Sequence, residues 1–279
     1  MKKIIFLLLL IVGVSTVSSC SKAEEDSDVL LVSIEPLKGM LSNIVGDKYE
    51  VYSVIPSTAS PESYNPTIQD MQQMSNASLF FGVGVPAEES NIVTKLSDNT
   101  TVVSLQNSIE SLYLPNGGRD PHIWLSIDRV KIIVNEMYEE LIKIDADNKD
   151  TYKDNLDKYL VDLDETKTKI IDIFSGATKK SFITYHPSLN YFASDFGLDA
   201  YAIEKNGQEP SPKELAETVD EAKEIGFKTV FYQSSVNSSE VYTVATEIGA
   251  KTVEYDPLSS DYLNNLIVIA NKIRASLDE

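Results

Sequence analysis

The chain of 279 residues has one cysteine, one tryptophan and only two histidines. Since Cys20 is the sole cysteine, no disulfide can form within the chain, and the folded state must depend on its hydrophobic core. Long apolar stretches are also scarce. The one at residues 4–14 is about half as long as the roughly 20 residues that a transmembrane helix requires.

Basic residues are few as well: 24 Lys and Arg stand against 43 Asp and Glu, which gives a net charge of −19. This imbalance disfavours nucleic acids and anionic lipid surfaces as partners, because both are themselves negatively charged. It is compatible with a cationic ligand. We therefore expect no nucleic-acid partner.

Residues 1–20 have the layout of a bacterial lipoprotein signal peptide. Two lysines precede the apolar stretch, small residues follow it, and Cys20 comes directly after them, which resembles a lipobox whose cysteine becomes the lipidated N-terminus. An ordinary signal peptide followed by an unrelated cysteine is the alternative. Residues 21–28, SKAEEDSD, are predicted to form a flexible tether. We expect an exported lipoprotein, anchored to a membrane in the periplasm or on the cell surface.

Short β-rich segments alternate with helical periods through the rest of the chain, and this alternation predicts parallel sheets. The expected strands are residues 29–34, 49–55, 79–83, 101–105, 181–185, 198–203, 229–232 and 252–255. The expected helices are residues 37–45, 67–76, 127–144, 188–195, 212–225, 238–248 and 262–276, besides a longer one between the two halves.

That longer helix is predicted over residues 148–174, which contain no glycine or proline and carry apolar residues at helical spacing. A helix of about 27 residues is about 40 Å long, which suits a spine between two lobes. We therefore predict an α/β fold of two βα lobes with parallel sheets, residues 29–147 and 175–279. One long rigid helix joins them, and the ligand cleft lies between them.

Four side chains that can bind a metal follow predicted strands: Glu62, His122, His186 and Asp256. In open parallel sheets the ligand crevice lies beyond the carboxyl ends of the strands, so two side chains from each lobe are expected to face one cleft. Two neutral imidazoles and two carboxylates carry a formal charge of −2, which balances a divalent ion. A proline adjoins each of the four and restricts the local backbone.

Five segments resemble, in order, the landmarks of the metal-binding solute receptors of bacterial zinc and manganese ABC importers. They are SPESYNPT (60–67), DPHIWLS (120–126), TYHPSLNYFASDFGL (184–198), EPSPKEL (209–215) and EIGAKTVEYDPL (247–258). The similarity covers essentially the whole mature chain. It implies two α/β lobes, a rigid linking helix, one metal ion between the lobes and delivery to a membrane permease. Carried over residue by residue, it places the metal ligands at Glu62, His122, His186 and Asp256.

The chain departs from this family at the first ligand position, where SPE at residues 60–62 replaces an Asp-Pro-His segment. Glu62 is therefore an inferred carboxylate replacement, and Ser63 or a water molecule is the alternative donor. A carboxylate favours manganese or ferrous iron, and residues 106–119 lack the histidine-rich loop of many zinc members. His186 in contrast resembles zinc-type members. These features conflict; the expected ion is Zn²⁺, with Mn²⁺ or Fe²⁺ as the alternative.

Two further residues, which are not predicted to bind the metal themselves, are candidates for positioning the ligands. Tyr185 adjoins His186 and either shapes the cleft or packs in the core. Glu209 precedes the helix predicted at residues 212–225, where it either forms part of the cleft rim or places a favourable charge near the helix N-terminus.

The predicted function is that of a monomeric receptor, not an enzyme, which captures one divalent metal and passes it to a permease. A zinc metallohydrolase needs an open coordination position and a base beside the bound water, and the chain has no HExxH motif and no nucleophile constellation. An iron-chelate or corrinoid receptor shares the architecture but needs a large apolar or basic cleft. A structural or adhesive role is a further alternative.

Overall fold

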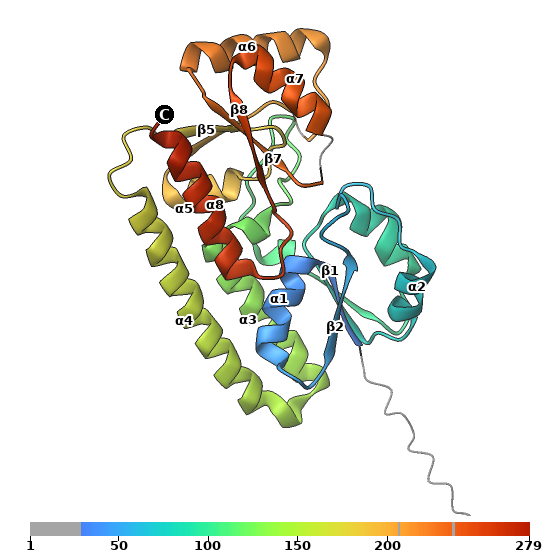
Figure 1. Cartoon of the computed structure of the whole chain (residues 1–279). Coiled ribbons are helices and arrows are strands. Elements are labelled where there is room, and N and C mark those ends of the chain that lie inside the picture. Colours follow the sequence, from blue (N-terminus) through green and yellow to red (C-terminus); the bar gives the residue numbers. More distant parts are fainter. Residues whose placement is uncertain (1–28, 206, 236–237) are drawn as a thin grey trace, which may run out of the picture.

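The computed structural model describes residues 29–205, 207–235 and 238–279, which contain two four-stranded parallel sheets flanked by helices (Figure 1). The predicted signal peptide, the lipidation site at Cys20 and the tether lie outside the described residues. Within the described part, no helix has both the length and the apolar character needed to cross a membrane.

The first sheet has the strand order β2-β1-β3-β4, and all neighbouring strands are parallel. Its strands are β1 (Val29–Ile34), β2 (Glu50–Ile55), β3 (Leu79–Gly82) and β4 (Thr101–Ser104). β1 is buried along its whole length, as its nearly continuous apolar sequence VLLVSI predicts for a central parallel strand. Helices α1 (Glu35–Val45) and α2 (Ile68–Ser75) connect these strands.

The second sheet repeats this order as β6-β5-β7-β8, again with parallel neighbours. Its strands are β5 (Ser181–Thr184), β6 (Asp199–Ala202), β7 (Thr229–Gln233) and β8 (Lys251–Tyr255). The helices of this half are α5 (Asn190–Phe196), α6 (Pro212–Ile225), α7 (Ser238–Ile248) and α8 (Tyr262–Leu277). In each sheet the strand order reverses between the first and third strands, and such a switch point is where α/β sheets bind ligands.

The connection between the halves consists of α3 (Ile127–Ile144) and α4 (Lys149–Phe174). α4 matches the predicted long helix to within one residue, but it is not a solitary spine, because it packs against α1, α3 and α8. One buried core includes the first sheet, these helices, and Phe182 and Phe231 of the second sheet. A smaller core lies between the second sheet and helices α6 and α7.

The two halves also meet directly at α1. Gly39 of α1 lies against the backbone carbonyl of Ser260, in the loop before α8, and a Cβ at this position would clash with that oxygen. This close approach joins the first half to the second independently of α4.

Candidate metal site

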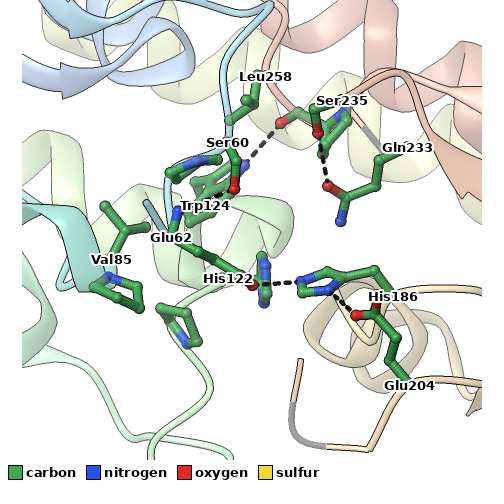
Figure 2. Close-up of a pocket in the computed structure, with 14 residues that line it drawn as sticks. Ser60, Glu62, Val85, His122, Trp124, His186, Glu204, Gln233, Ser235 and Leu258 are labelled. Atoms are coloured by element: carbon green, nitrogen blue, oxygen red, sulfur yellow. Dashed lines mark hydrogen bonds and ion pairs between the residues drawn. The ribbon is translucent and has the colours of Figure 1, made fainter. Parts of the chain in front are cut away.

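A cavity of about 90 Å³ opens at the carboxyl ends of both sheets (Figure 2). It is lined by Ser60, Pro61, Glu62, Val85, Pro86, Pro121, His122, Trp124, His186, Glu204, Gln233, Ser235, Pro257 and Leu258. No described lysine or arginine is among them. The cavity lies where the sequence predicts the ligand cleft, beyond the strand ends.

His122 is held by a buried carboxylate two residues earlier in the chain. Its Nδ1 donates to Asp120 Oδ1 at 2.7 Å, and its backbone N–H donates to the same oxygen at 3.0 Å. Burial opposes ionisation of Asp120, but the hydrogen bonds and charge of His122 outweigh burial, so the pKa of Asp120 is lowered. With the Nδ1 proton fixed in this way, the lone pair of His122 Nε2 is left available to a metal ion.

His186 is held in the same manner from the other side of the cavity. Its Nδ1 donates to Glu204 Oε2 at 2.7 Å, and its Nε2 lies 3.1 Å from Glu62 Oε1. Burial lowers the pKa of His186, but the hydrogen bond to Glu204 and the charges of Glu62, Glu204 and Asp120 outweigh burial, so this pKa is raised above 6.5.

Three of the four predicted ligands therefore lie together. The imidazole rings of His122 and His186 are 5.2 Å apart between centroids and meet edge to face at 76°. Glu62 reaches them from the loop after β2, as Figure 2 shows, and its side chain is 40% exposed.

The fourth predicted ligand, Asp256, is not among the lining residues, although its neighbours Pro257 and Leu258 are. Asp256 Oδ1 accepts a hydrogen bond from the Leu258 N–H at 2.7 Å. As they stand, no three His, Cys, Asp or Glu side chains of the described residues are arranged to hold a metal ion. In this arrangement Glu62 is paired with His186, and Asp256 accepts a hydrogen bond from a backbone amide.

Comparison with known proteins assigns this fold and sequence to a family. Residues 30–276 match the model of the family described as ZnuA, zinc-uptake complex component A, periplasmic. The chain belongs to the ZnuA family. This confirms the resemblance predicted from the five sequence segments, and it places the chain among components of uptake complexes.

Two relatives of this ZnuA-family chain carry the names of different metals. It is 29% identical over 263 residues to the manganese-binding lipoprotein MntA of Halalkalibacterium halodurans, covering 89% of this chain and 87% of that protein. It is 28% identical over 266 residues to the high-affinity zinc uptake system protein ZnuA of Bacillus subtilis, covering 88% and 83%. A crystal structure of ZnuA superimposes with a TM-score of 0.84 at 32% identity, covering 90% of this chain and 99% of that one, which confirms the two-lobe fold.

Asp120 and Glu204, which hold the two candidate histidine ligands of this ZnuA-family chain, were not predicted from the sequence. Asp120 had a local signal, because a carboxylate two residues before a histidine can reach its Nδ1. Glu204 had none, because its position depends on the register of two strands. β5 and β6 pair Thr184 with Ala202, so the residues two places beyond each, His186 and Glu204, come to lie opposite one another.

The two supporting residues proposed from the sequence lie elsewhere. Tyr185 and Glu209 line a separate cavity against α6 and α7, and the Tyr185 hydroxyl donates to Glu240 at 3.3 Å. Successive side chains of an extended segment point to opposite faces, so Tyr185 faces away when His186 faces the metal cavity. This alternation is a sequence signal that could have separated the two.

The His122 turn is bonded to the second half, although it precedes α3 in the chain. Trp124 Nε1 donates to the Pro257 carbonyl at 2.8 Å, and the Tyr191 hydroxyl donates to the Asp120 carbonyl at 3.0 Å. The loop of Glu62 instead bonds within the first half, for example from the Ala87 N–H to the Pro61 carbonyl at 3.1 Å. The two histidines thus form one fixed unit, and Glu62 faces it from the other side.

The carboxylates behind the histidines are expected to contribute to metal affinity. Asp120→Asn and Glu204→Gln should each weaken metal binding about 10-fold, because a neutral amide no longer orients the imidazole or raises its basicity. Competition with a metal chelator at pH 7.5 measures the effect. Asp154→Asn, on the exposed surface of α4, is the matched control and should leave affinity unchanged. Wild-type affinity in both site variants would contradict the proposed support.

Proposed function

We propose that this ZnuA-family chain is the solute-binding lipoprotein of an ABC importer. It captures one divalent transition metal, with Zn²⁺ preferred over Mn²⁺ and Fe²⁺, and delivers the ion to a membrane permease. The proposal includes export, lipid anchoring at Cys20 and action as a monomer, without catalysis.

One observation carries the proposal: two imidazoles point into a single cavity, each with its Nδ1 hydrogen-bonded to a carboxylate at 2.7 Å. Histidines that bind metals typically donate their second ring N–H to a carboxylate in this way. The two bonds fix both tautomers and leave both Nε2 atoms for the same ion.

The charge around the cavity supports a cation as the ligand. The carboxylates of Glu62, Asp120 and Glu204 contact the two imidazoles, and none of the described lining residues is a lysine or an arginine. A divalent ion would neutralise most of this charge, whereas an anion would be repelled. The small volume of about 90 Å³ also fits an ion better than an iron chelate or a corrinoid.

We infer that Glu62, His122, His186 and Asp256 are the ligands of the bound ion. On binding, the ion replaces the contact between Glu62 and His186. His186 Nε2 and the Glu62 carboxylate then bind the metal and no longer contact each other. Asp256 releases the Leu258 N–H to reach the same ion. Two imidazole nitrogens favour zinc, and the two carboxylates leave manganese and ferrous iron as competitors.

The deciding experiment is a calorimetric titration of the metal-stripped mature protein with Zn²⁺ and with Mn²⁺ under competition. One equivalent of tightly bound Zn²⁺ and much weaker Mn²⁺ is the expected result. Tighter Mn²⁺ would overturn the preference for zinc while keeping the receptor function. Absence of stoichiometric binding of either ion would overturn the proposed function.

A further inference from the structure

Gly207 of the second half packs against the contact between Glu62 and His186, although it is not among the residues that line the cavity. Its backbone has a φ of +70°, a conformation that favours glycine. A Cβ atom at this position would lie 3.1 Å from His186 Cε1 and 3.2 Å from Glu62 Oε1. Both distances are shorter than ordinary van der Waals contact, so a side chain at position 207 would have to move one of these two groups.

The pairing of the second sheet places Gly207 beside the two ligands. The Glu204 N–H donates to the Tyr185 carbonyl at 2.9 Å, so the chain beyond β6 still runs alongside the segment that follows β5. The chain then turns back, and the Gln208 N–H donates to the Lys205 carbonyl at 3.2 Å. Gly207 lies in this turn. One short segment therefore supplies both the carboxylate that holds the second imidazole and the glycine that packs against it.

Of the two groups that Gly207 packs against, Glu62 is the one that can move. The His186 side chain is only 8% exposed, and its Nδ1 is bonded to Glu204 at 2.7 Å. The Glu62 side chain is 40% exposed, and it reaches the contact from the loop of the other half. A side chain at position 207 would therefore displace the Glu62 carboxylate from His186 Nε2 and leave the imidazole in place.

We propose that Gly207 is a positioning residue for Glu62, because its missing side chain leaves the space in which the carboxylate lies beside His186 Nε2. This inference rests on the proposed metal-receptor function. An ion bound at about 2.0–2.2 Å from each of these atoms would hold them about 3.0–3.5 Å apart. They are 3.1 Å apart in the structure, so the position that Gly207 allows is close to the one that the ion requires.

The test measures Zn²⁺ affinity by chelator competition for Gly207→Ala, both in the otherwise wild-type chain and in a Glu62→Ala background. In the wild-type chain the substitution should weaken binding about 10-fold, as for other groups that position metal ligands from outside the shell. In the Glu62→Ala background it should change affinity by less than about twofold, because no carboxylate remains to be displaced. Gly207→Leu should give the same pattern with a larger loss.

Gly176→Ala is the matched control for the strain that any side chain introduces at such a backbone angle. Gly176 has a φ of +73°, but a Cβ there would meet no atom of the described chain within 4 Å. Both alanine variants should lower the melting temperature of the metal-free protein by similar amounts. Only Gly207→Ala should lower metal affinity. A crystal structure of metal-free Gly207→Ala should show Glu62 displaced and His186 still bonded to Glu204.

The outcomes separate this inference from the proposed function. Equal losses of affinity for Gly207→Ala with and without Glu62 would overturn the inference, because Gly207 would then act independently of that carboxylate. Unchanged affinity in both Gly207 variants, or a Glu62 carboxylate that keeps its place in the crystal, would overturn it as well. If wild type binds Zn²⁺ and Glu62→Ala binds it equally well, the inference fails and the receptor function stands. If wild type binds no metal, the proposed function itself fails.

Discussion

His186→Ala is expected to lower metal affinity by about 100-fold or more. Protein zinc sites with four ligands bind with roughly 10–16 kcal/mol, or about 3 kcal/mol for each ligand, and each 1.4 kcal/mol is a factor of ten. His186 is the only residue whose two ring nitrogens contact carboxylates on both sides of the cavity, Glu62 at Nε2 and Glu204 at Nδ1. Chelator competition at pH 7.5 measures the loss, which should be of the same size for His122→Ala.

Circular dichroism of the metal-free variants separates loss of the site from loss of the fold. Because the chain has only these two histidines, the double variant His122→Ala/His186→Ala removes all imidazole and should bind Zn²⁺ only through carboxylates. A single variant that keeps a native spectrum and also keeps wild-type affinity would exclude that histidine from the ligand set.

Metal affinity should also fall steeply as the pH drops from 7.5 to 5.5. The pKa of His186 is raised above 6.5, since the hydrogen bond to Glu204 and the charges of Glu62, Glu204 and Asp120 outweigh burial. Below that pKa a proton occupies the Nε2 that the ion needs, so affinity falls up to about tenfold per pH unit for this group alone. Over the two pH units the expected loss is therefore about 10-fold to 100-fold, measured by competition titration at each pH.

Protonation of His186 lowers metal affinity, but it stabilises the folded state of the metal-free protein. A pKa raised in the folded state means that His186 contributes stability below its unfolded pKa of about 6.5, and that this contribution disappears as the pH rises through the folded pKa. Thermal unfolding of wild type and His186→Ala at several pH values, in the presence of a chelator, measures this contribution to stability. If affinity were constant between pH 7.5 and 5.5, neither histidine would be a ligand.

The sequence alone predicted the local elements well. The ends of every predicted strand and helix agree with the structure to within two residues. Those signals are local, because apolar periodicity, glycine and proline breaks and the Ser211 helix cap act within a few residues of chain. The alternation of strands and helices then predicted the two parallel sheets, which the structure confirms.

The contacts that position the candidate ligands could not be predicted from the sequence alone. The pairing of Glu204 with His186 follows from the register of β5 on β6, and the link from Trp124 to Pro257 joins residues 133 apart in the chain. The orientation of Asp256 depends on the turn that offers it the Leu258 N–H. None of these contacts produces a periodic pattern in the sequence from which it could be predicted.

The sequence by itself therefore determined the elements, the family resemblance and the loops that carry Glu62, His122 and His186. Only the tertiary structure decided which carboxylates hold the histidines and that Tyr185 faces another cavity. The physical reason is that backbone periodicity is set by neighbouring residues, whereas the partner of a side chain is set by strand register and packing between distant segments.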